Sequence, residues 1–104
     1  TSSIRTPAPL ERYFRDALTR RPGYSEAANN LALVLVSRGQ ADAAVALIEE
    51  TLKKAPDYAT GYLTLARIHA SLGHTREAVD ALQRLLKRDP TNAVALELIR
   101  QMKG

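Results

Sequence analysis

An internal repeat with a period of 34 residues is the feature that most constrains this chain. Residues 25–58 form one unit and residues 59–92 the next, and shifting the sequence by one period superimposes its landmarks. The aligned residues are Pro22, Pro56 and Pro90; Gly39 and Gly73; Ala44 and Ala78; Leu31, Leu65 and Ile99; and Phe14, Ile48 and Leu82. A period of this length, with two helix-length segments in each unit, is typical of an α-solenoid. The repeat therefore predicts an all-α solenoid of antiparallel helix pairs.

The composition fits this architecture. Apolar residues make up 45% of the chain and aromatic residues only 5%, so the interior must be built from alanine and aliphatic side chains, which allow helices to approach closely. A chain of 104 residues forms one domain and is too short for separate substrate and cofactor lobes. Cysteine is absent, which excludes disulfides and thiolate metal ligands.

Helical spacing and helix-ending residues predict six helices after an extended lead-in at residues 1–7. The predicted helices span residues 8–20, 25–38, 41–54, 59–72, 75–88 and 93–102. Ser25 is the expected N-cap of the second helix. Prolines end the helices that precede them, because proline cannot continue the hydrogen-bond ladder. Gly39 and Gly73 permit short turns, so each helix pair must lie antiparallel.

Apolar residues at helical spacing predict the core. The expected inward-facing residues are Ala28, Leu31, Ala32 and Leu35; Ala44, Leu47, Ile48, Thr51 and Leu52; Tyr62, Leu65, Ala66 and His69; Ala78, Leu82, Leu85 and Leu86; and Leu96 and Ile99. Ala32 is expected to face Ala44 where paired helices come closest, and Ala66 to face Ala78. The residues Glu49, Glu50, Lys53 and Lys54 are expected to face solvent.

The repeat resembles the tetratricopeptide repeat. The resemblance rests on Ala28, Leu31, Ala32, Leu35, Ala44, Ile48, Thr51 and Pro56 in the first unit, and on Tyr62, Leu65, Ala66, His69, Ala78, Leu82, Leu85 and Pro90 in the second. It covers almost the whole chain, as a half repeat at 8–24, full repeats at 25–58 and 59–92, and a half repeat or capping helix at 93–104. Departures from the family pattern occur at Ala28, His69 and Leu85. The resemblance implies a right-handed superhelix of six helices, and the half units are typical of a segment of a longer array.

The resemblance also implies a concave groove that binds a partner protein. By family position the groove residues are Glu26, Asn29, Asn30, Leu33, Val36, Ser37, Thr60, Leu63, Thr64, Arg67, Ala70, Ser71, Val94, Glu97, Leu98 and Gln101. Within this set an apolar strip is predicted from Leu33, Val36, Leu63, Val94 and Leu98. The expected ligand is an amphipathic helix or an extended peptide with apolar anchors. Alternatively, the strip contacts neighbouring helices or a further unit.

Some family members bind a partner's C-terminal carboxylate through a set of Lys, Asn and Arg residues. The corresponding places here hold Asn29, Leu33, Thr64, Val94 and Leu98, so that set is largely missing. The expectation is therefore a non-catalytic scaffold or assembly module whose partner the sequence does not identify.

Catalytic, cofactor and metal sites are not predicted. His69 is expected in the core and His74 in a turn, with no carboxylate or cysteine at a spacing that suits a shared metal ion. A nucleic-acid interface rests on charge alone, because the net charge is +4 and 11 of the 15 basic residues are arginine. The arginines enriched at the start of the chain are Arg5, Arg12, Arg15, Arg20 and Arg21. Acidic residues are interleaved further along, and no aromatic stripe offers base stacking.

Self-association is a further alternative, because Leu10 and Phe14 in the first predicted helix, and Leu98 and Met102 in the last, are expected to be exposed. Solenoid ends usually carry polar caps. The longest apolar run, residues 31–36, is far too short to span a bilayer. No secretory signal is visible, but a chain that begins at Thr1 is typical of an excised segment, so the sequence does not indicate a compartment.

Overall fold

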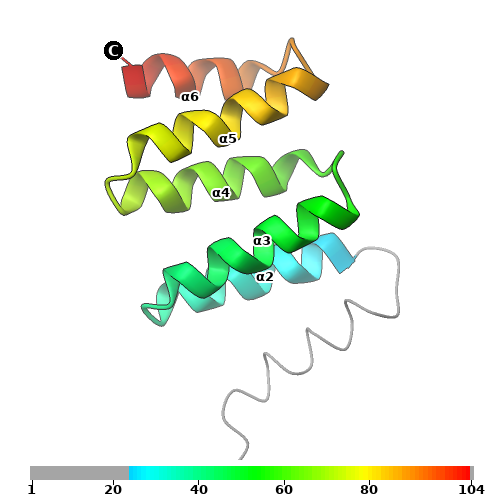
Figure 1. The fold of residues 1–104 in the computed structure, drawn as a ribbon, viewed down its shortest axis with the longest axis vertical. Helices are drawn as coiled ribbons and strands as arrows, with labels where there is room; N and C mark the ends of the chain where they lie inside the picture. Colours follow the sequence, from blue (N-terminus) through cyan, green and yellow to red (C-terminus); the bar gives the residue numbers. More distant parts are fainter. Residues whose placement is uncertain (1–23, 104) are drawn as a thin grey trace, which may run out of the picture.

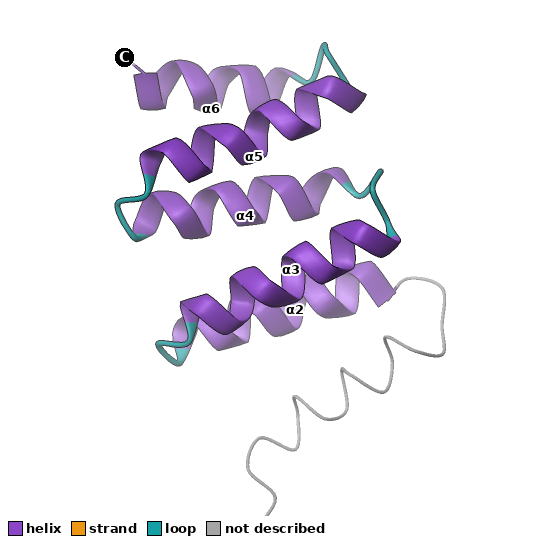
Figure 2. Cartoon of the chain, viewed as in Figure 1, coloured by secondary structure: helices purple, strands orange, loops and turns teal. Residues whose placement is uncertain are grey.

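The computed structural model describes residues 24–103 (Figure 1). This part of the chain contains five α-helices, which are α2 (Tyr24–Ser37), α3 (Ala41–Lys54), α4 (Ala59–Ser71), α5 (Thr75–Arg88) and α6 (Ala93–Lys103). Short turns connect them, and no strand occurs between residues 24 and 103 (Figure 2). The helix predicted at residues 8–20 lies outside the described residues. For the described part, the prediction of an all-α helical repeat is confirmed.

The helix bounds follow the sequence prediction closely. Helices α3 and α5 begin and end at the predicted residues, and the other three differ by one residue at one or both ends. Helix α2 begins at Tyr24, so Ser25 lies inside its first turn and is not the N-cap that was predicted. The first turn of α6 is capped instead by Asn92, whose Oδ1 accepts a hydrogen bond of 3.0 Å from the amide of Ala95.

The two predicted glycine turns have the same geometry. Gly39 and Gly73 have φ values of 77° and 80°, a left-handed conformation that glycine adopts without steric cost. In each turn the amide of the following residue returns to the last helical turn, from Gln40 to Leu35 and from His74 to His69, both at 2.8 Å. These bonds satisfy carbonyl groups at the helix ends and reverse the chain, as the prediction of antiparallel pairs requires.

Helix pairs α2–α3 and α4–α5 stack through contacts of α3 with α4 and of α5 with α6 (Figure 1). Ala32, Ala44, Ala66 and Ala78 are all fully buried, which confirms that small residues occupy the places where the paired helices come closest. The largest fully buried side chains recur at the 34-residue spacing, as Leu31 and Leu65 and as Ile48 and Leu82. The core is therefore a continuous apolar layer shared by successive helices.

Helix α6 departs from the prediction on one face. Leu96 was expected inside but is 50% exposed, and Ile99 is only partly buried, whereas Ala95 is fully buried. The residues one and two periods before Leu96, Tyr62 and Ala28, are buried in pairs with α5 and α3. No helix within residues 24–103 covers the corresponding side of α6, and this is why Leu96 remains exposed.

A second departure concerns Glu49, which was predicted to face solvent. Arg84 of α5 donates two hydrogen bonds to its carboxylate, at 3.0 and 2.9 Å, and so joins α3 of the first unit to α5 of the second. The Arg84 guanidinium also lies 5.4 Å from the ring centre of Tyr62, whose hydroxyl donates a hydrogen bond to the carbonyl of Pro56 at 2.9 Å. The hydrogen bonds to Glu49 raise the pKa of Arg84 further.

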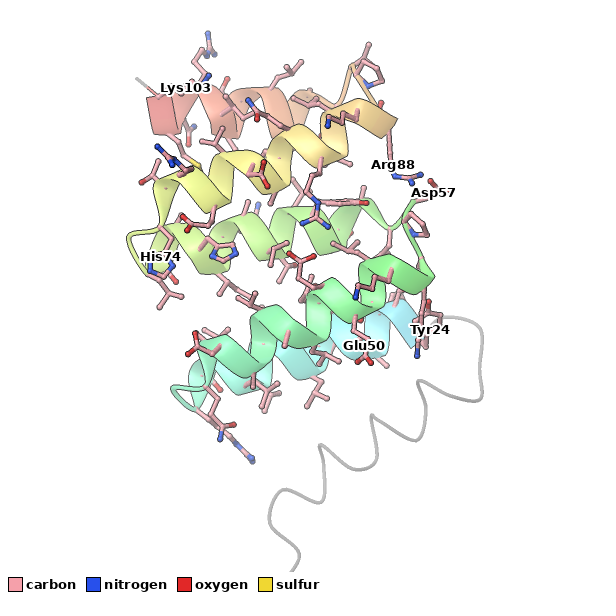
Figure 3. All side chains as sticks on the ribbon, in the orientation of Figure 1. Tyr24, Glu50, Asp57, His74, Arg88 and Lys103 are labelled. Atoms are coloured by element: carbon pink, nitrogen blue, oxygen red, sulfur yellow. The ribbon has the colours of Figure 1, made fainter. Side chains whose placement is uncertain are left out.

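A second ion pair joins the same two units near the ends of α3 and α5. Nη1 of Arg88, the last residue of α5, donates a hydrogen bond of 2.9 Å to Oδ1 of Asp57 in the turn between α3 and α4 (Figure 3). Both side chains are exposed, so this pair contributes little to stability.

Candidate functional site

Helices α2 and α4, the first members of their pairs, contact each other and form the walls of a hollow of about 340 Å³. Its lining residues are Asn29, Leu33, Val36, Thr60, Thr64, Arg67, Ile68 and Ser71. All of these except Ile68 belong to the groove predicted from the family resemblance. The structure therefore brings seven of the predicted residues together around one cavity.

The hollow has a buried floor and an accessible rim. Asn29, Thr64 and Ile68 are buried, whereas Leu33 is 50% exposed and Arg67 is also exposed. A partner would therefore meet an aliphatic and a cationic side chain before reaching the polar groups beneath them.

Most polar groups of the lining have a known environment, but Asn29 does not. The Ser71 hydroxyl donates a hydrogen bond of 2.8 Å to the carbonyl of Ile68, so it is satisfied within α4. The Oδ1 atom of Asn29 is buried and has no hydrogen-bond partner among residues 24–103. An unsatisfied buried amide group costs about 1–3 kcal/mol, so Asn29 marks a place where the fold gives up stability.

Tyr58 lies where α3 is joined to α4, next to the start of the hollow. Its pKa is raised, first by burial and then by the negative charge of Glu26 on α2, while a hydrogen bond with Thr60 acts in the opposite direction. Since Thr60 lines the hollow, this phenol and Glu26 belong to its immediate surroundings.

The other nine predicted groove residues do not line this cavity. Glu26, Asn30, Ser37 and Ala70 are exposed, and Leu63 packs in part against the core. The remaining four, Val94, Glu97, Leu98 and Gln101, are on α6. Of the predicted apolar strip, only Leu33 and Val36 line the hollow.

The α6 residues have neighbours of their own. Val94 is 47% exposed, whereas Leu98 is partly buried against the core. The Glu97 carboxylate accepts hydrogen bonds from Arg100 and Gln101 on the same helix. The groove contribution of α6 thus remains a prediction.

His69 and His74 flank the turn between α4 and α5. Their ring centres lie 6.0 Å apart, and His69 is only half-buried, with its Nδ1 atom buried and unpaired in the described structure. Within residues 24–103 no group of three or more His, Cys, Asp or Glu side chains is placed to hold a metal ion.

The described residues carry little net charge. They include ten basic and nine acidic side chains, so most of the positive charge of the chain belongs to residues 1–23. None of the helices from α2 to α6 combines the length and the apolar character needed to cross a membrane.

Comparison with protein families identifies the repeat. The family model described as tetratricopeptide repeat matches residues 11–60 and again residues 35–102. The chain belongs to the tetratricopeptide-repeat family. Repeats of this family generally mediate protein–protein interactions and are typically non-catalytic. A comparison with curated proteins found no matching sequence.

Proposed function

We propose that this tetratricopeptide-repeat domain is a non-catalytic scaffold or assembly module that binds a peptide or amphipathic helix of another protein on the concave side formed by α2, α4 and α6. The principal site is the hollow between α2 and α4. We also infer, from the family, that its helix pairs wind into a right-handed superhelix.

The observation that carries this proposal is the exposure of Leu33 at the rim of a cavity. A half-exposed leucine on a surface is ordinary, but here it stands beside Val36 and above the buried side chain of Ile68. Inserting an apolar side chain would remove Leu33 from water, and burial of apolar surface favours binding by about 25 cal/mol per Å². Clefts that combine apolar walls with a few polar groups are the usual form of a ligand site.

The experiment uses short random peptides displayed as a library and selected on the immobilised domain, followed by affinity measurements with the selected peptides. Leu33→Glu should abolish binding, because it places a charge at the apolar rim. The matched control is Leu72→Glu, since Leu72 is also an exposed leucine but does not line the hollow. Equal affinities for the two folded variants would contradict the proposal.

Self-association is a second candidate, supported by the exposure of Val94 and Leu96 on α6. The observation that Leu98 and Met102 are partly buried corrects the prediction that these two residues form the exposed apolar surface. One substitution argues against a second copy adding a helix to α6 as α3 packs on α2, because Arg100 stands where the other units have the buried Ala32 and Ala66.

Sedimentation over a range of concentrations decides between these candidates. A parent domain that dimerises, and a Leu96→Glu variant that stays monomeric, would favour self-association. A parent that remains monomeric at high micromolar concentration would refute it.

A further inference from the structure

We propose that the hollow between α2 and α4 selects an extended peptide segment, which exchanges backbone hydrogen bonds with the Asn29 amide and places a carboxylate on Arg67. This inference rests on the proposed function, which leaves open whether the ligand is a helix or an extended chain and gives it no charge.

The first argument is the unsatisfied amide. Asn29 is 9% exposed, lines the hollow, and has an Oδ1 atom without a partner within the described structure. An asparagine amide both donates and accepts hydrogen bonds, and rotation about its terminal bond can present either group to a ligand. Because burial of an unpaired polar group is costly, a ligand that supplies the missing partner gains free energy that water does not already provide.

The second argument decides the conformation of the ligand. In an α-helix the backbone groups bond to one another except at the two ends, so a helix lying in the hollow offers Asn29 no backbone partner. An extended segment presents both N–H and C=O groups along its length. The orphaned amide therefore favours an extended segment.

The third argument concerns charge. Arg67 is the one formally charged residue among the eight that line the hollow, and it has no ion-pair partner among residues 24–103. A guanidinium group binds a carboxylate through two parallel hydrogen bonds, more strongly where water is partly excluded. The ligand should therefore carry Asp or Glu at the point that reaches Arg67.

The size of the hollow sets the spacing of the two ligand side chains. A volume of about 340 Å³ corresponds to a width of about 7 Å. Alternate residues of an extended chain point to the same side and lie about 6.7 Å apart. The expected motif is thus an aliphatic residue for Leu33 and Val36, and an acidic residue two positions away for Arg67.

Selection of displayed random peptides on the parent domain tests the motif. The inference expects enrichment of an aliphatic and an acidic residue at this spacing. It also expects the motif to tolerate proline elsewhere in the peptide, because an extended chain needs no helical hydrogen bonds. Selected peptides that bind only as helices, or that show no acidic preference, would overturn the inference. If they still lost binding with Leu33→Glu, the proposed function would stand. Failure to select any peptide that depends on Leu33 would overturn both.

Two variants give sharper readouts with a selected acidic peptide. Arg67→Glu should weaken its binding at least tenfold and should select basic residues at the same peptide position. The matched control Arg76→Glu reverses an exposed arginine of α5 outside the hollow and should bind like the parent.

Asn29→Leu should lower the affinity about five- to tenfold, the loss expected for one hydrogen bond, while leaving the domain equally stable or more stable in urea. Reduced stability with unchanged affinity would show a structural role for Asn29, and an unchanged peptide preference with Arg67→Glu would remove the carboxylate contact. Either result would refute the inference.

Discussion

Replacing Ala44 by leucine is expected to destabilise the domain strongly, because this side chain lies at the closest approach of α3 to α2. Ala44 and Ala32 are both fully buried, so the added carbon atoms have no free space to enter. Extra methyl and methylene groups in a packed core cost about 1–3 kcal/mol, because neighbouring side chains and backbone must move apart. For a domain of this size, each kcal/mol lowers the melting temperature by about 4–8 °C.

The matched control is Ala46→Leu in the same helix. Ala46 is exposed, so the same change in residue type should alter the free energy of unfolding by no more than about 0.5 kcal/mol. Urea unfolding followed by circular dichroism measures both variants. Equal stabilities for the Ala44 and Ala46 variants would refute the conclusion that small residues set the distance between paired helices.

Three further predictions concern the turn, the ion pair and the phenol. Gly73→Ala should cost about 1 kcal/mol in urea unfolding and Gly73→Asn less, because an added Cβ meets no atom within 4 Å and only the positive φ is unfavourable; equal losses would contradict this. A double-mutant cycle between Glu49→Gln and Arg84→Met should give a coupling of about 0.5–1 kcal/mol that falls with added salt, since both side chains are more than a third exposed, at 36% for Arg84 and 39% for Glu49; no coupling at low salt would remove the ion pair from the account. The raised pKa of Tyr58 means that the folded state binds the phenolic proton more tightly, so stability should fall as the pH rises above 10.0, and Tyr58→Phe should show a smaller loss in pH-dependent unfolding.

The helix bounds could be predicted because local chemistry determines them. Gly39 and Gly73 allow the left-handed turn that ends a helix, and prolines at the 34-residue spacing stop the second helix of each pair. The same periodicity predicted the buried alanines, because helical spacing assigns each residue to a face. Ser25 failed as a cap because the neighbouring tyrosine also adopts helical geometry, and sequence rules rarely place an end more closely than one residue.

Features that depend on distant residues could not be predicted from helical faces alone. Leu96 occupies an inward position of the repeat, but its burial requires a helix that no residue between 24 and 103 supplies. Glu49 lies on a face that appears solvated in the sequence, and its partner Arg84 is 35 residues away on another helix. Ile68 was missed in the hollow because family positions, and not contacts between α2 and α4, defined the predicted groove, although Ile68 follows Thr64 by one helical turn.

The most direct test of the binding site is an NMR titration of the isotopically labelled domain with a peptide selected on it, following backbone and side-chain amides. Binding in the hollow should shift the signals of Leu33, Thr64 and Arg67 and the side-chain amide of Asn29, while Arg76 and Lys87 on α5 remain unchanged. Shifts confined to the outer surfaces of α3 and α5, with the signals of the hollow unmoved at saturation, would contradict the account.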